Sequence, residues 1–399
     1  MSEIRVTNIL GENGNSPVNF TQGINMSGIV TATSFVPTVG QLSHRNLVIN
    51  GDMRIAQRAT TSTAVSAYNT IDRMQGNSGG TDEAPTQAQV DVASGTTPYT
   101  LGFRKSFRFT NGNQTSGAGA SDYVHLKMVL EAQDIANSGW NYTSSSSYIT
   151  LSFWVKSSVA QDFSATLRTE DGTRQVYNMT TGSLTADTWT KITKTIPGNS
   201  NLQFDDNANS GLTLFINAFT GTSNTTTGLA QNTWSAWGGA KYAADMASTW
   251  YTTNDATFEF TGIQLEVGPV ATPFEHRSYG DELQRCRRYY QVLVDQAGSG
   301  SNKSFAIACA YSSTSMHSTH LLSPEMRTVP TLDYTTGTDY YRAYYNNTAD
   351  YFDQFALVGN SHANAVDLMV SSGLSVTLGN AVLIRTTNAA SKIAFTAEL

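Results

Sequence analysis

Hydrophobic residues in much of this chain recur at every second position, in short runs that polar turns separate. In YITLSFWVKS, Ile149, Leu151, Phe153 and Val155 alternate with polar residues, and Trp154 is the exception on the polar side. A period of two is the pattern of a strand with one buried face. The chain is therefore predicted to be rich in β-strands.

A hairpin and a bulge can also be predicted. Asp171 and Gly172 separate two strand-like runs, which is a strong hairpin signal. In FEFTGIQLEV the apolar positions change parity between Phe260 and Ile263, and a β-bulge at Gly262 would restore one inward face. Many short strands with long connections, such as 76–98 and 221–250, predict a two-sheet sandwich of the jelly-roll type.

The pattern divides the chain into four parts. Residues 1–42 carry apolar pairs separated every few residues by Gly, Asn or Ser, and such short strands cannot bury a core alone. This arm is either disordered or ordered by packing against copies of itself or a docking partner; the regular apolar spacing favours the second alternative. Residues 43–277 are predicted to form the jelly roll and 292–399 a smaller C-terminal β-sandwich.

One segment between these domains has helical spacing, at i, i+3, i+4 and i+7: Leu283, Cys286, Arg287 and Tyr290. Ser278 or Asp281 can cap its start, and Asp281 can pair with Arg285 one turn later. We predict a linker helix over 278–291, with the charged residues around it forming the solvated side of a connector. Cys286 lies on the apolar side and is expected to be buried rather than reactive.

In the C-terminal domain, SFAIACAY places Phe305, Ile307, Cys309 and Tyr311 on one face and three alanines on the other. The alanine face can approach another surface closely. The fold class is thus all-β: an extended arm, a jelly roll, a short helix and a second β-domain.

Composition excludes several function classes. The net charge of -7 is spread thinly, and no segment carries the basic stripe of a nucleic-acid-binding protein. No stretch approaches the 18 apolar residues of a membrane span, and the N-terminus does not resemble a signal peptide. We therefore expect a soluble protein made in a cytosol. Cys286 and Cys309 cannot form a disulfide framework and are expected to be reduced and structural.

An ordered series of segments suggests a family. NLVINGDMRIAQR, NTIDRMQ, YITLSFWVKSS, TWTKITKTI, FTGIQLEVGPVATPFEHRSYGDELQRCRRYYQ, PEMRTVPTL and AFTAEL resemble successive landmarks of tail-fibre-type virion proteins of tailed bacteriophages. The arm, with TGIVTATSF, resembles segments of cyanophage structural proteins. Met74 stands where such proteins commonly carry Trp, which is expected to alter core packing rather than role.

This resemblance implies a jelly roll similar to carbohydrate-binding modules, within a homotrimeric fibre or receptor-binding appendage of the virion. Residues 1–42 would then intertwine or dock on other virion proteins, and 292–399 would form the distal tip. The protein would be assembled in the cytoplasm of the bacterial host.

Motifs for catalysis or metal binding are weak. No phosphate-binding loop or His-Glu-x-x-His is present. His317 and His320 would point to opposite faces of a strand and so would not share an ion. No cofactor is expected, although Asp205 and Asp206 offer oxygen ligands for a possible calcium ion that turn chemistry explains equally well. Asp52 and Glu266 are a second calcium alternative.

Sugar binding has more support, because sugars stack their C–H faces on exposed aromatic rings. Every tryptophan lies between 140 and 250, and tyrosines concentrate after 333. The candidate glycan contacts are Trp154, Trp234, Trp237, Trp250, Tyr251, Tyr341, Tyr344 and Tyr345. The alternative is that these rings fill the sandwich ends, a β-core or a subunit interface.

We therefore predict a non-enzymatic virion protein that binds host cell-surface polysaccharide as a tail fibre, for receptor binding and host attachment. One alternative is a purely structural capsid or collar fibre. A depolymerase that cuts host polysaccharide is a further alternative, because the spacing of a carboxylate pair is not visible in sequence.

Overall fold

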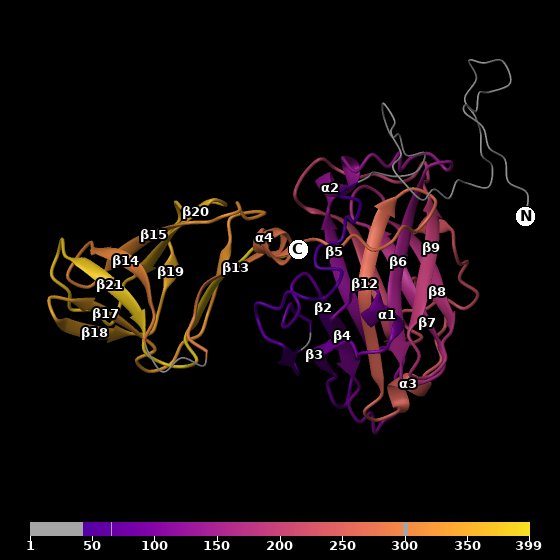
Figure 1. Ribbon diagram of the computed structural model, residues 1–399, viewed down its shortest axis with the longest axis horizontal. Helices are drawn as coiled ribbons and strands as arrows, with labels where there is room; N and C mark the ends of the chain where they lie inside the picture. The colour runs from indigo at the N-terminus through magenta and orange to yellow at the C-terminus, as the bar shows by residue number, and fades with distance from the viewer. Residues whose placement is uncertain (1–42, 65, 298–301) are drawn as a thin grey trace, which may run out of the picture. The chain divides into compact units, whose positions relative to one another are not determined.

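The computed structural model describes residues 43–64, 66–297 and 302–399. The predicted arm, 1–42, lies outside the described residues. The described chain is all-β with a few short helices, as the alternating pattern predicted (Figure 1).

Two six-stranded antiparallel sheets are built from residues 61–267. The first has the order β1-β3-β4-β12-β6-β9 and the second β11-β8-β7-β10-β5-β2. Strands of the first sheet are β1 (Thr61–Ser62), β3 (Thr86–Asp91), β4 (Lys105–Thr110), β12 (Thr257–Val267), β6 (Tyr148–Ser157) and β9 (Thr190–Pro197). Those of the second are β11 (Trp234–Ala236), β8 (Gln175–Ser183), β7 (Asp162–Thr169), β10 (Ser210–Thr220), β5 (Tyr123–Glu131) and β2 (Gln75–Gly79).

One hydrophobic core joins the two sheets, because alternate residues of each strand point between them. In β6 the inward residues include Leu151 and Phe153, whereas Trp154 is half-buried on the outer face, as predicted. In β5 the inward residues are Val124, Leu126 and Met128. The short helices α1 (Thr97–Thr100), α2 (Ala132–Ala136) and α3 (Thr249–Thr252) lie in the connections.

The predicted hairpin and bulge are both confirmed. β7 and β8 pair antiparallel across the turn that contains Gly172, whose φ is +56°. The pairing of β12 with β6 shifts between Thr261 and Gln264, and Gly262 has a φ of +66°. Both Phe260 and Ile263 are consequently buried, so the bulge keeps the inward face continuous.

Helix α4 (Tyr279–Arg287) lies within the predicted linker range. The hydroxyl of Ser278 accepts a hydrogen bond from the Asp281 amide at 3.1 Å, so Ser278 caps the helix as predicted. The Oδ2 atom of Asp281 lies 3.7 Å from the Nε atom of Arg285. Cys286 is fully buried, as predicted, and burial raises the pKa of its thiol well above the usual value.

The remaining strands form a three-stranded sheet, β13-β22-β16, and a seven-stranded sheet, β18-β17-β21-β14-β15-β20-β19. The smaller sheet contains β13 (Tyr290–Asp295), β22 (Lys392–Thr396) and β16 (Thr331–Tyr334). The larger contains β18 (Thr348–Phe352), β17 (Tyr341–Tyr345), β21 (Ala381–Thr386), β14 (Ser304–Ala310), β15 (Met316–Leu321), β20 (Ala365–Val370) and β19 (Ala356–Leu357). Their hydrophobic clusters are separate from that of the first two sheets. The exact domain boundaries stay a prediction.

The prediction for β14 was partly wrong. Its pairing with β21 shifts between Ser304 and Ala306, so Phe305 turns inward and its ring packs on Tyr341. Ile307 remains outward and is 72% exposed. Cys309 is exposed rather than structural, because it lies on the same outward side.

Candidate functional site

A groove lies on the outer face of the second sheet, where β2, β5 and β10 meet. In β5 the residues that alternate with the core positions, Tyr123, His125 and Lys127, face outward. The cavity measures about 310 Å³. Its lining residues are Gln75, Asn77, Tyr123, His125, Lys127, Arg168, Phe215, Thr220, Asn224 and Tyr242.

The register of the strands brings these side chains together. Lys127 is opposite Gln75 on β2 and Phe215 on β10. His125, one step along the outer face, is opposite Asn77 on β2. Such neighbours on one sheet face lie close enough for their side chains to touch. The connection after β10 contributes the remaining wall, with Asn224 and Tyr242.

Aromatic rings form a connected surface in the groove. Tyr123 stacks on His125, with ring centroids 5.2 Å apart and planes 19° apart. His125 meets Phe215 edge-on at 5.2 Å, and Phe215 meets Tyr242 edge-on at 5.6 Å. Phe215 is buried under this layer, whereas the other three rings are half-buried. The partly open rings of Tyr123, His125 and Tyr242 can therefore contact a ligand.

Arg168 lies on strand β7 and contacts both the groove wall and Glu170. Its guanidinium lies 5.1 Å from the Phe215 ring centre and donates a hydrogen bond to the Tyr242 hydroxyl at 3.4 Å. On its other side it bonds the Glu170 carboxylate at 2.8–2.9 Å. The side chain thus holds Tyr242 in place and leaves the groove with a cation in its wall.

Two further groups in the groove have perturbed ionisation. Burial lowers the pKa of His125 to about 3, and the charges of Lys127 and Arg168 act in the same direction. The imidazole is therefore neutral at pH 7 and carries one donor and one acceptor. Burial also lowers the pKa of Lys127, against the attraction of Glu170. Within the described part of the chain, the Lys127 ammonium has no hydrogen bond or ion pair.

Some polar atoms of lining residues have no partner. The Thr220 hydroxyl and the Gln75 side-chain carbonyl are buried and make no hydrogen bond among the residues that the structure describes. Buried polar atoms in folded proteins are nearly always paired with protein or water. Each of these two atoms can therefore form a hydrogen bond with water or with a ligand hydroxyl.

Among the predicted glycan contacts, Trp237 lies beside this groove. Its half-buried ring packs edge-on against Tyr242, with centroids 4.6 Å apart, and lies 5.0 Å from the Arg168 guanidinium. Trp154 lies on the other sheet, in a cavity of about 380 Å³ that Phe103, Phe274 and His276 also line. The structure therefore does not bring Trp154 and Trp237 together.

Three other candidates fill the core of the sandwich. Trp250 and Tyr251 are fully buried, and Trp234 is 9% exposed. Their polar tips have partners: the Trp250 indole donates to the Thr257 carbonyl at 3.0 Å, and the Tyr251 hydroxyl bonds Asp122 at 3.1 Å. A ring with its polar tip satisfied can be buried without penalty. These surfaces are not accessible to a sugar, so we do not include them in the site.

The C-terminal candidates are separate again. Tyr341 is fully buried, and its hydroxyl bonds the Thr335 carbonyl at 2.7 Å. Tyr344 is half-buried on the outer face of the sheet, 4.6 Å from the Arg385 guanidinium. The Tyr345 hydroxyl bonds the Ser375 carbonyl at 2.7 Å. Of the three, only the Tyr344 ring lies on an open sheet face.

The candidate calcium ligands do not converge. Asp206 accepts a hydrogen bond from Asn137 at 2.8 Å, and Asp205 accepts one from Gln203 at 3.3 Å. Glu266 is bonded by Thr272, whereas Asp52 pairs with Arg54. In the described residues there is no group of three or more His, Cys, Asp or Glu side chains that could hold a metal ion. A calcium site at any of these positions stays a prediction.

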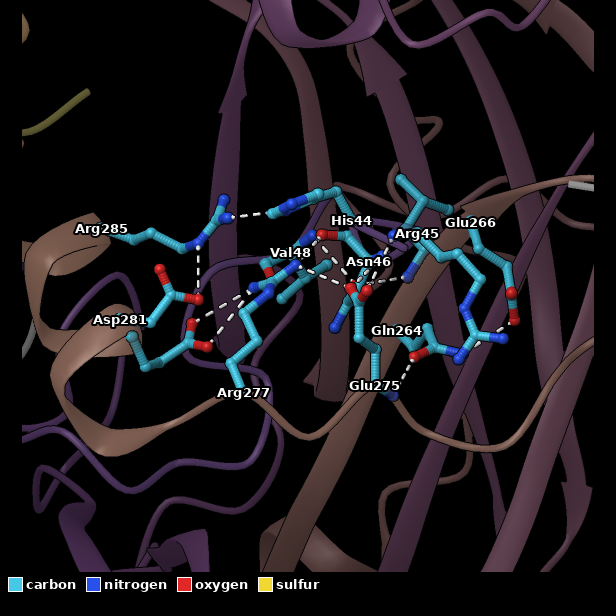
Figure 2. Close-up of polar contacts among 12 residues, drawn as sticks. His44, Arg45, Asn46, Val48, Gln264, Glu266, Glu275, Arg277, Asp281 and Arg285 are labelled. Atoms are coloured by element: carbon cyan, nitrogen blue, oxygen red, sulfur yellow. Dashed lines mark hydrogen bonds and ion pairs between the residues drawn. The ribbon is translucent and has the colours of Figure 1, made fainter. Parts of the chain in front are cut away.

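The charged stretch around α4 was predicted to be solvated, but part of it is buried: Glu282 is buried, whereas Asp281 is exposed. Figure 2 shows the side chains of Glu275 and Arg277 pointing toward residues 45–48. The Glu275 carboxylate accepts hydrogen bonds from the Arg45 and Asn46 amides at 3.1 and 3.0 Å. Arg277 contacts both Glu275 and Glu282, and its side chain is only 6% exposed. Glu275, Arg277 and Glu282 pair with one another because this segment packs against the start of the sandwich.

No protein-family model and no curated protein matches the chain. Among solved structures, the enzymatically active domain of tailspike protein 4 from bacteriophage CBA120 is 10% identical, over 56% of this chain and 21% of its own, with a TM-score of 0.30. The N-terminal cellulose-binding domain of β-1,4-glucanase C from Cellulomonas fimi is 8% identical, over 55% of this chain and 99% of its own, with a TM-score of 0.26. The family 11 carbohydrate-binding module of Clostridium thermocellum, in complex with a mixed-linked tetrasaccharide, is 14% identical. The match covers 54% of this chain and 99% of that module, with a TM-score of 0.24. These TM-scores are below 0.5, so we infer no function from the likenesses.

Sequence reasoning missed most of the groove. Tyr123 and His125 occupy the outward positions of an alternating strand, which is the same signal that singled out Trp154. Applied to YVHLKMVLE, that signal would have found them. Tyr242 and Asn224 lie in an irregular connection and carry no local signal, because their place depends on how that connection folds over β10.

Proposed function

We propose that this protein binds a polysaccharide in the groove on the outer face of the second sheet. The observation that carries the proposal is the pairing of half-buried rings, Tyr123 and Tyr242, with side-chain amides, Asn77 and Asn224, in one cavity. Rings accept the C–H faces of sugars, and amides bond their hydroxyls. The unpartnered Thr220 hydroxyl adds a polar group for such a ligand.

The chemistry of the groove supports binding without catalysis. Among the described residues that line it, none is Asp or Glu. Glycoside hydrolysis in most enzymes requires two carboxyl groups on either side of the scissile bond. We therefore propose a non-enzymatic role for this site, and a depolymerase remains the alternative that an activity assay would reveal.

The proposed biological role is recognition of host cell-surface polysaccharide by an external fibre of a phage particle. This proposal rests on the ordered sequence landmarks described above. It includes a homotrimer, attachment to other virion proteins through residues 1–42, and assembly in the bacterial cytoplasm. Among the described residues, no helix is long and apolar enough to cross a membrane.

The test of binding is affinity electrophoresis of the purified full chain through gels that contain host polysaccharide. The proposal predicts retardation that free polysaccharide relieves, with no release of reducing ends during incubation. Release of reducing ends would favour the depolymerase, and unchanged mobility with every host polysaccharide would contradict binding. Antibody labelling of intact virions then separates a tail fibre from a structural capsid or collar fibre, and light scattering tests the trimer.

A further inference from the structure

We infer that the polysaccharide bound in the groove is acidic, with carboxylate or sulfate groups that meet Lys127. This inference rests on the proposed function and names the class of ligand for the same site. It follows from the charges of the groove, which differ in sign from the charge of the chain as a whole.

The described residues that line the cavity include basic side chains but no carboxylate. Lys127 and Arg168 are the groups that carry positive charge there, since His125 is neutral at pH 7, and no Asp or Glu is among the described lining residues. The net charge of the chain is -7, so a cationic groove is a local feature rather than a consequence of composition. A concave site with charges of one sign attracts ligands of the other sign.

Lys127 is the group whose charge the protein leaves without a direct partner. The charged groups near it are Glu170, Arg168 and Arg73, and two of these three are cations. The Glu170 carboxylate is already bonded by other groups: Arg168 at 2.8 Å, Arg174 at 3.1 Å and the Thr213 hydroxyl at 2.7 Å. Lys127 is half-buried, so its ammonium has lost part of its hydration without gaining an ion pair within the described structure.

On the outer face of the first sheet, by contrast with Lys127, two cations have an ion-pair partner. There Glu259, which is buried, lies 3.0 Å from both Arg108 and Lys156. Arg108 and Lys156 are therefore neutralised within the protein. An ammonium that is partly desolvated and unpaired binds an anion more favourably than a fully hydrated one, because less water has to be removed.

The ring surface places such an anion next to a sugar. Lys127 and His125 are neighbours on the outer face of β5, and Tyr123 stacks on His125. A sugar ring that covers His125 and Tyr123 would direct a substituent toward Lys127. Arg168 lies across β10, opposite Thr213, and already holds Tyr242. We therefore assign Lys127 as the residue that binds the acidic group of the ligand, whereas Arg168 holds Tyr242 in the groove wall.

The test uses pairs of polymers that differ in charge and share a backbone. Polygalacturonate is compared with its methyl ester, and dextran sulfate with dextran, by calorimetric titration of the full chain. We expect the charged member of at least one pair to bind about tenfold or more tightly, since a hydrogen bond to a charged group is stronger than a neutral one. The pair that shows the preference identifies carboxylate or sulfate as the group recognised.

Variants show whether Lys127 is responsible. Lys127→Gln should remove the preference, whereas Lys127→Arg should retain it. Lys191→Gln is the matched control, because Lys191 is an exposed lysine on the other sheet and has no ion pair among the described residues. Equal losses in Lys127→Gln and Lys191→Gln, with native melting temperatures, would show general attraction and overturn the inference.

The remaining outcomes separate this inference from the proposed function. Binding of neutral polymers without preference for the charged ones would leave polysaccharide binding intact and overturn the acidic ligand. Binding of single-stranded DNA as tightly as of polygalacturonate would also overturn it. Binding of no polymer, including host polysaccharide, would contradict both.

Discussion

The guanidinium of Arg288 makes two hydrogen bonds to the carboxylate of Glu131, at 2.7 and 2.8 Å. Glu131 ends strand β5 and its side chain is fully buried, whereas Arg288 follows helix α4 and is about one-third exposed. Tyr289 donates a third hydrogen bond to the same carboxylate, at 2.5 Å. One carboxylate at the end of a groove strand therefore fixes the start of the C-terminal sheets.

We predict that Arg288→Ala destabilises the protein by about 3 kcal/mol, because it leaves Glu131 buried with one fewer cation. Arg287→Ala is the matched control, since the structure describes no ion pair for Arg287 and a change within about 0.5 kcal/mol is expected. Urea unfolding measures both. Equal stability of the two variants would show that the contact contributes little.

The same contact predicts a pH dependence. Burial alone would raise the pKa of Glu131, but the hydrogen bonds from Arg288 and Tyr289 outweigh it and lower the pKa below its ordinary value of 4.5. A lowered pKa means that the folded state binds the proton less readily than the unfolded state. The stabilisation is therefore complete above pH 4.5 and is lost as the pH falls below it.

We expect the free energy of unfolding of Glu131→Gln to fall less steeply with acid than that of the natural protein. Unfolding in urea at a series of pH values between about 6 and 3 would measure the two slopes. Other carboxylates, such as Glu275, titrate in both proteins and cancel in the comparison. Parallel curves would contradict a role for Glu131.

Gly262→Ala is predicted to destabilise the sandwich by about 1–3 kcal/mol. Gly262 has a φ of +66°, and an added Cβ would lie 2.6 Å from the Phe103 ring. Gly239→Ala is the control, because a Cβ there meets no atom within 4 Å and the backbone is not in the left-handed region. Thermal unfolding compares the two; a Gly262→Ala protein as stable as the control would mean that the bulge relaxes without cost.

The tryptophans give a prediction that separates the two sheets. Trp237→Ala should weaken polysaccharide binding about tenfold, because its ring supports Tyr242 and Arg168, while Trp154→Ala should leave binding in the groove unchanged. Melting temperatures of both variants control for folding. If Trp154→Ala alone reduces binding, the ligand occupies the cavity on the first sheet instead.

The cysteines can be distinguished chemically. Cys309 is exposed and should react with a thiol reagent in the native protein, whereas Cys286 should react only after unfolding. Counting thiols with and without urea gives one and then two if this is correct. No reaction before unfolding would indicate that another copy of the chain covers the outer face of β14.

Much of the fold could be predicted because its signals are local. Alternation in β6, the turn at Gly172 and the parity change around Gly262 each need only a few neighbouring residues to be recognised. The short helix was recognisable for the same reason, with Ser278 as its cap. The prediction for Phe305 was wrong because a register shift after Ser304 depends on pairing with β21, which no local pattern records.

The site was harder to predict because it is made by pairings of distant strands. Lys127, Gln75 and Phe215 become neighbours only when β5 lies between β2 and β10. Trp250 and Tyr251 stand in a segment with the composition of a loop, yet they are buried because their polar tips find partners across the sandwich. Residue type alone cannot separate a core ring with a satisfied tip from an exposed ring.

The most direct test of polysaccharide binding in the groove is the affinity of Tyr242→Ala for host polysaccharide, measured beside Tyr279→Ala. Tyr242 lines the groove, whereas Tyr279 is 59% exposed on helix α4 and lines none of the cavities described above. We predict that Tyr242→Ala binds about tenfold or more weakly with an unchanged melting temperature, because sugar stacking on its ring is lost, and that Tyr279→Ala binds as the natural protein does. Full affinity in Tyr242→Ala, or an equal loss in both variants, would contradict binding in this groove.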